Sequence, residues 1–184
     1  ALKEGMVQQF ETTNQGPDDS EPKTTKGEFV VLKTERDGES IVVTHEFKTG
    51  EKNEVEKTMF QLDPDGLRLL SRESQWNMVS DGAYPEMPAE LWPGQIYQVR
   101  LSSNMSDGEE RARLITDQVV KVIGWEETEM PGGKTMKALR IEIEATSLFD
   151  DSLNRSKATE WYAPDLGIVK LKSSSRWSNS ISQM

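Results

Sequence analysis

The chain has 184 residues, a length typical of one domain, and 34% of them are hydrophobic while 29% are charged. Its 32 acidic residues outnumber 22 basic ones, and the net charge of −10 repels nucleic acid and anionic membrane surfaces at long range. The absence of cysteine excludes disulfides, thiolate metal sites, cysteine nucleophiles and iron–sulfur clusters. No apolar run approaches the roughly 20 residues that a membrane-spanning helix needs, so we expect no transmembrane segment.

The first third of the chain alternates strand patterns with turn signals. A strand is predicted over residues 6–12, and the stretch near 14–25, which contains Gly, Pro, Asp and Ser, is typical of a mobile loop. Two β-branched runs, 28–34 and 40–48, then flank Asp37-Gly38. This dipeptide between two such runs is the strongest hairpin signal in the sequence.

The middle of the chain continues the pattern. We expect a return strand over 54–62, a tight Asp-Pro-Asp-Gly turn over 63–66, and a further strand that starts at Leu67. Residues 80–94 contain Gly82, Pro85, Pro88, Pro93 and Gly94. These breakers exclude a helix there, so we expect a loop before regular strands resume over 95–102.

The last third contains the cleanest alternation. Residues 111–125 fit one long strand or two, and 139–145 place Leu, Ile and Ala on one side with Arg and Glu on the other. Period two is what a strand with one dry face requires. We expect a polar loop over 149–157 and a final hairpin of 159–163 with 167–172.

About ten strands with frequent turns predict an all-β fold, either an antiparallel meander sandwich or a half-open barrel, with little helix. We expect a single β domain over residues 1–184. Its irregular parts would be the mobile loop near 14–25 and a Ser-rich C-terminal tail from 173.

No residue pattern indicates catalysis. His45 is the only histidine, so a His-rich zinc site is impossible, and no Gly-x-Ser-x-Gly elbow marks a nucleophile for it. The acidic residues Glu126, Glu127 and Glu129 are expected on a solvated edge. We therefore expect no catalytic residue, no metal site and no cofactor, and the protein is predicted not to be an enzyme. A carboxylate hydrolase would need two acids that converge in a cleft, with a raised pKa on one.

Aromatic residues are the best candidates for ligand contacts. Five tryptophans could fill the core, or some could line a groove and stack on a sugar or an apolar ligand. Trp92 lies in a Leu-Trp-Pro-Gly loop and is the one most expected to be exposed. The groove candidates are Trp92, Trp125, Trp161, Tyr84 and Tyr97.

Three motifs follow one another in an order that resembles a known family. They are Leu-Trp-Pro-Gly-Gln-Ile-Tyr at 91–97, a strand–turn–strand stretch with Pro-Gly-Gly at 121–142, and Trp-Tyr-Ala-Pro-Asp-Leu-Gly-Ile-Val-Lys at 161–170. Leu-Lys-Glu-Gly at 2–5 is similar to the family's entry to its first strand. The chain resembles the TapB-like bacterial envelope proteins and lipoproteins, a family without an established function.

The resemblance implies export, a β fold and a half-barrel similar to lipoprotein carriers, and it implies no reaction and no catalytic residues. It places the protein in the periplasm or on the cell surface, with its leader removed and a lipid anchor possible upstream of Ala1.

The sequence therefore favours two non-catalytic functions over hydrolysis. The first is a non-catalytic exported envelope protein that binds an apolar or polymeric ligand in a β-sheet groove. The alternative is an envelope-anchored interaction or structural module that binds another protein through an edge strand or a loop.

Overall fold

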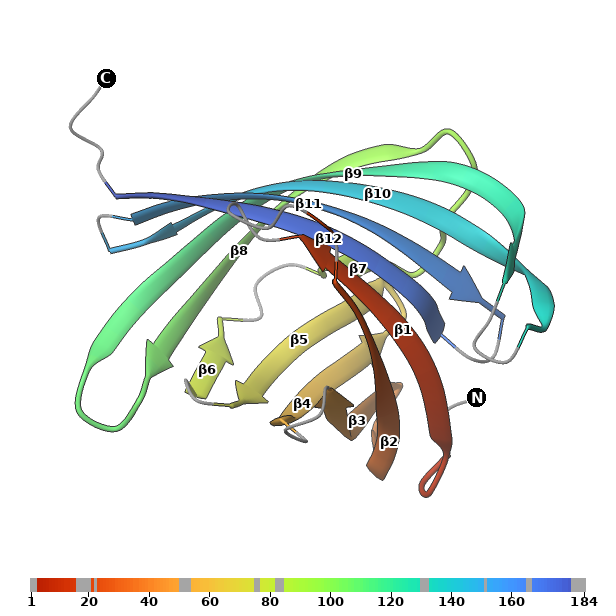
Figure 1. The fold of residues 1–184 in the computed structure, drawn as a ribbon. Coiled ribbons are helices and arrows are strands. Elements are labelled where there is room, and N and C mark those ends of the chain that lie inside the picture. The colour runs from red at the N-terminus through yellow and green to blue at the C-terminus, as the bar shows by residue number, and fades with distance from the viewer. Residues whose placement is uncertain are drawn as a thin grey trace.

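The computed structural model describes residues 3–15, 21, 23–49, 54–74, 77–81, 85–129, 133–150, 152–164 and 167–179 (Figure 1). These residues contain 12 strands and no helix. In chain order the strands are β1 (Val7–Gln15), β2 (Lys23–Asp37), β3 (Ser40–Thr49), β4 (Glu54–Asp63), β5 (Gly66–Glu73), β6 (Asn77–Ser80), β7 (Met87–Pro88), β8 (Ile96–Ser106), β9 (Arg111–Glu129), β10 (Thr135–Phe149), β11 (Ser152–Ala163) and β12 (Gly167–Asn179).

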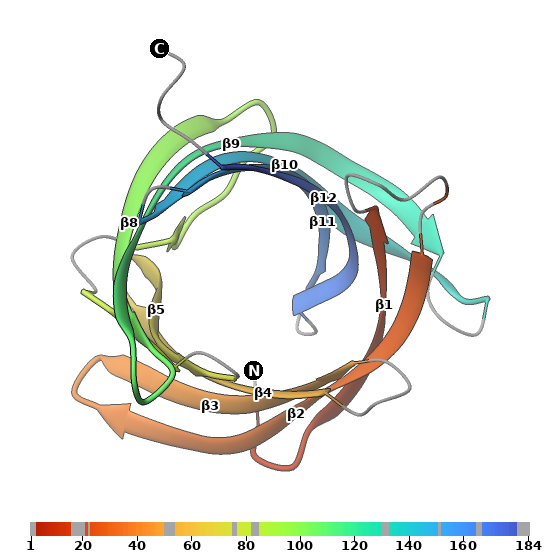
Figure 2. The ribbon, with the colours of Figure 1, turned by 60° about the vertical axis from the view of Figure 1, so that its left-hand side comes forward.

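All 12 strands form one sheet that curls into a nearly closed barrel (Figure 2). The order is β4-β3-β2-β1-β12-β11-β10-β9-β8-β6-β5-β7, and a further pairing of β4 with β5 closes the sheet on itself. Every neighbouring pair is antiparallel except β1 with β12, which run parallel. The predicted all-β class is confirmed, and of its two forms the structure adopts the barrel.

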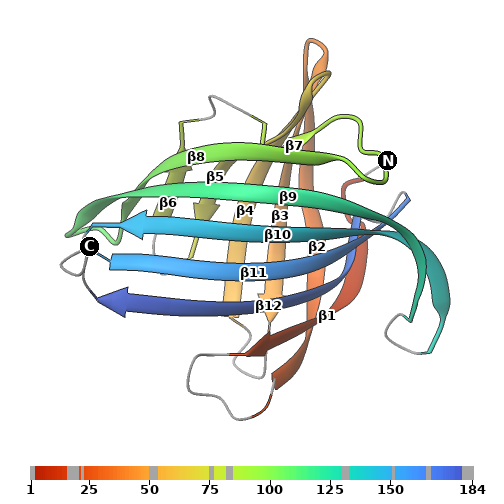
Figure 3. The same ribbon diagram turned by 90° about the horizontal axis from the view of Figure 1, so that it is seen from above.

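The strands on opposite sides of the barrel form two layers that cross one another (Figure 3). Seen from above, β8 to β12 run side by side across the strands β2 to β5 that lie behind them (Figure 3). Long strands twist strongly, and this twist lets one sheet serve as both layers. The layer of β8 to β12 carries the candidate site.

Three segments expected to be irregular are partly strand. Most of the predicted polar loop over 149–157 is strand, because β10 runs to Phe149 and β11 starts at Ser152. The Ser-rich segment from 173 belongs to β12 as far as Asn179. Of the loop predicted near 14–25, residues 14–15 belong to β1 and 23–25 to β2, and most of the others lie outside the described residues. Polar residues form strands here because a barrel strand needs an apolar residue only at positions that face inward.

The core of the β8–β12 layer lies on both faces of the sheet. The inward cluster consists of Val120, Val122, Leu139 and Ile141. The second cluster consists of Ala138, Trp161, Ala163 and Val169. Ala138 and Leu139 are consecutive and both buried, so their side chains point to opposite faces. Register shifts next to Arg140 and Trp161 mark β-bulges at this end of the layer, which bend the strands.

His45 is a core residue of the other layer. Its ring is 6% exposed and lies between Phe29 and Phe60, with ring centroids at 4.2 and 5.0 Å. Its buried Nδ1 has no hydrogen-bond partner among the described residues. Burial, with a smaller contribution from the positive charge of Arg72, lowers the pKa of His45 from 6.5 to about 4.

This histidine makes stability depend on pH. Because its folded-state pKa is depressed, its contribution is complete above pH 6.5 and is lost as the pH falls through about 4. The free energy of unfolding should fall by roughly 3 kcal/mol from this group alone. In His45→Leu this part of the acid destabilisation should be missing, which urea unfolding at pH 7 and pH 3.5, about half a unit below the folded pKa, would measure. Equal losses in the two proteins would contradict the assignment.

Candidate functional site

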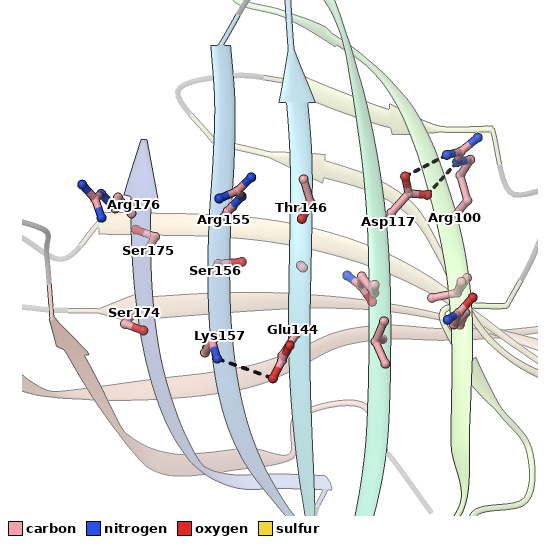
Figure 4. A pocket seen from close by; sticks show the side chains of 15 residues that line it. Arg100, Asp117, Glu144, Thr146, Arg155, Ser156, Lys157, Ser174, Ser175 and Arg176 are labelled. Atoms are coloured by element: carbon pink, nitrogen blue, oxygen red, sulfur yellow. Dashed lines mark hydrogen bonds and ion pairs between the residues drawn. The ribbon is translucent and has the colours of Figure 1, made fainter. Parts of the chain in front are cut away.

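An open trough of about 950 Å³ crosses five neighbouring strands, β8 to β12 (Figure 4). Its lining residues form three lines that follow the cross-strand register. The first line, here called the Glu144 row, is Gln98, Val119, Glu144, Lys157 and Ser174. The second, called the Asp117 row, is Arg100, Asp117, Thr146, Arg155 and Arg176. Between them lies the floor, formed by Val99, Gln118, Ala145, Ser156 and Ser175.

Strand alternation places the two rows on the outer face of the barrel. Ala145 lies two residues after Ile143, which packs against the inward core, so both side chains point into the barrel. Glu144 and Thr146 flank Ala145 and therefore point outward, and both are exposed. The trough thus consists of two parallel walls of outward side chains with strand backbone between them.

The acidic side chains of the trough, Asp117 and Glu144, form ion pairs with basic side chains. Arg100 donates from Nε and Nη2 to the two carboxylate oxygens of Asp117 at 2.6 and 2.8 Å. This bidentate contact lowers the pKa of Asp117 and keeps its carboxylate ionised. Glu144 lies 3.5 Å from the Nζ of Lys157 and 3.9 Å from that of Lys121. Exposed pairs of this kind add little stability, but they orient the side chains.

The tryptophans proposed for a groove do not line the trough. Trp92 is exposed in the loop before β8, and Trp125 of β9 is half exposed with the Nζ of Lys137 5.9 Å from its ring centre. Trp161 is buried, and its Nε1 donates to Glu126 at 2.6 Å. The Glu126 side chain is 40% exposed and lies where β9 pairs only with β10, and it accepts this hydrogen bond from Trp161.

The tyrosine candidates lie elsewhere. Tyr84 is outside the described residues, and Tyr97 packs against the inward core. There Tyr97 lies in a polar cluster with Tyr162, Glu160 and Glu86, in which the Tyr162 hydroxyl donates to the Glu160 carboxylate. Burial raises the pKa of both carboxyls and of Tyr162, and it raises the pKa of Tyr97 to about 12.

This inward cluster has one element of an acid–base site, since two carboxyls with raised pKa values lie close enough for Glu86 to affect Glu160. Its surroundings are those of a core. Met87, Leu91 and Tyr162 pack against the inward apolar cluster. Raised carboxyl pKa values here favour protonated groups that hydrogen-bond within the barrel.

In the part of the chain that the structure describes, no three or more His, Asp or Glu side chains gather as metal ligands. Across the same residues, no helix has the length and apolar character to cross a membrane.

Sequence reasoning missed the trough because it depends on register. Alternation alone shows that Arg155 and Lys157 share one face of β11, and that Ser174 and Arg176 share one face of β12. Which residue of one strand stands beside which residue of the next follows only from the pairing.

The comparisons with known proteins show the fold. No family model and no curated protein matches the chain, so the TapB-like resemblance stays a prediction. The chain is similar to the solved structure of a predicted lipoprotein from Parabacteroides distasonis, with 12% identity, a TM-score of 0.62, and 95% of this chain and 94% of that one covered. It is also similar to a predicted exported protein with a YmcC-like fold from Bacteroides fragilis, with 15% identity, a TM-score of 0.56 and the same coverage.

Proposed function

We propose that the protein is a non-catalytic exported protein of the bacterial envelope that binds an extended polymeric ligand across the outer face of β8 to β12. The observation that carries this proposal is the trough between the Glu144 row and the Asp117 row. Five strands at roughly 4.8 Å spacing make it about 20 Å long, enough for several units of a polymer. An envelope location is supported by the resemblance in sequence and by the descriptions of the two similar structures.

The shape and chemistry of the trough favour a polar polymer over an apolar small molecule. Sites for small ligands are mostly enclosed and lined by apolar side chains. The trough is open along its length, and charged or hydroxyl side chains form most of both walls. Of the two ligand classes that the sequence left open, the polymer fits this surface better.

The absence of a reaction is part of the proposal. The carboxylate of Asp117 is held ionised by Arg100, so it is not placed to donate a proton. Glu144 is paired with lysines. The carboxyls with raised pKa values, Glu86 and Glu160, lie with the inward core and not in the trough.

Calorimetric titration of the wild type and of a variant with a blocked trough tests the proposal. The wild type is titrated with glycan strands, with uncharged dextran and with polyanionic polysaccharides, and at least one polymer is expected to bind. Thr146→Trp would place an indole in the trough and should abolish this binding. Thr135→Trp, at an exposed position of the same strand β10 outside the trough, is the control and should bind normally. The proposal fails if no polymer binds, or if the blocked variant binds as well as the wild type.

The edge of β8 favours the alternative function, docking of a partner protein. Described pairing of β6 with β8 covers only Ser103 to Ser106, so Ile96 to Leu101 have no described strand partner on that side. Ile96 is 65% exposed there. A partner strand could add to this edge. A protein partner bound in this way would still bind Thr146→Trp and would be lost in Ile96→Lys.

A further inference from the structure

Charge is distributed unevenly along the trough. At the β8–β9 end, Arg100 is neutralised by Asp117. At the β11–β12 end, Arg155 and Arg176 of the same row are directly paired in the register of two antiparallel strands. Both side chains are exposed on the same face, as Figure 4 shows.

Neither arginine forms an ion pair with an acid among the described residues. The nearby acids of the trough are already engaged, Asp117 by Arg100 and Glu144 by lysines. Like charges directly opposite one another on neighbouring strands destabilise a sheet. This arrangement occurs in a chain with a net charge of −10, in which acidic partners are abundant.

Their surroundings suit an anionic group. A guanidinium presents a planar set of N–H donors that matches phosphate, sulfate and carboxylate, and two of them side by side can share one such group. The exposed hydroxyls of Thr146 and Ser174 stand in the same two rows and supply neutral donors beside the pair.

We propose that Arg155 and Arg176 form a subsite for a phosphate, sulfate or carboxylate group, so that the polymer bound in the trough is a polyanion. This inference rests on the function proposed above and specifies the class of ligand. The negative charge of the whole molecule repels polyanions at long range, and the local pair attracts one of their charged groups at the trough. Binding should therefore weaken steeply as salt is added.

Polymers of matched length and different charge test the subsite. Dextran sulfate and polygalacturonate are expected to bind at least about tenfold more tightly than uncharged dextran. Arg155→Gln and Arg176→Gln should each weaken this binding about tenfold, and the double variant should bind no better than uncharged dextran binds the wild type. Arg36→Gln, an exposed arginine at the β2–β3 hairpin, is the matched control and should change nothing.

Each outcome decides between the two proposals. If dextran binds as tightly as dextran sulfate while Thr146→Trp abolishes the binding of both, that result would support the trough as the polymer site and contradict the anionic subsite. The subsite also falls if the double variant keeps full affinity for dextran sulfate. Binding of inorganic phosphate itself at millimolar concentration, with no polymer bound at any concentration tested, would assign the pair to a free anion and overturn the polymer. The double variant should unfold at the same temperature as the wild type or higher, because a repulsion is removed, so loss of binding cannot reflect misfolding.

Discussion

Gly66→Ala is expected to lower the free energy of unfolding by about 4 kcal/mol, the sum of backbone strain and a steric clash. Gly66 begins β5 with a φ of +153°, a conformation that residues with a Cβ rarely adopt. A Cβ there would lie 2.2 Å from the carbonyl oxygen of Met87 and 2.9 Å from the Cβ of Pro85. The clash would separate β5 from β7, which pair at this point.

Gly124 provides a matched control for this substitution. Its φ is +150°, but no atom lies within 4 Å of the position that a Cβ would take. Gly124→Ala should therefore show the backbone strain alone, about 1–3 kcal/mol. Urea unfolding of both variants gives the difference, and equal losses would show that the contact with Met87 can relax without cost.

Ile141→Ala is expected to lower the free energy of unfolding by about 4 kcal/mol, in the upper part of the range for truncating a buried aliphatic side chain to alanine. The Ile141 side chain is fully buried in the inward cluster with Val120, Val122 and Leu139. Barrel strands on either side limit how far the neighbours can collapse into the cavity. Ile123→Ala, at a position that is 45% exposed on β9, is the control and should cost below about 1 kcal/mol. Thermal or urea unfolding that gives equal losses for the two variants would show that the inward cluster does not stabilise the barrel.

The parts of the fold that depend on local pattern were predictable. The hairpin at Asp37-Gly38 joins β2 and β3, and the alternation over 139–145 lies within β10 as one inward and one outward face. The lengths of β9 to β12 were underestimated because their outward residues are polar. The parallel pairing of β1 with β12 joins strands near the two ends of the sequence, and no local sequence pattern predicts such a long-range contact.

The candidate site was less predictable for the same physical reason. Arg155 and Arg176 gain their significance only when the register places them side by side, and Glu86 and Glu160 meet only when the barrel forms. The tryptophan hypothesis had a real alternative in core packing, and Trp161 follows that alternative. Trp92 and Trp125 are exposed but lie outside the trough, so their role as ligand contacts remains a prediction.

The most direct test of the trough is amide chemical-shift mapping with short oligomers of polygalacturonate. We predict perturbations confined to β8 to β12, strongest at Thr146, Arg155 and Arg176 of the Asp117 row. Uncharged dextran oligomers serve as the reference for the anionic subsite. Perturbations centred on Ile96 at the edge of β8, or on the inward cluster around Tyr97, would contradict a ligand site on the outer face of the barrel.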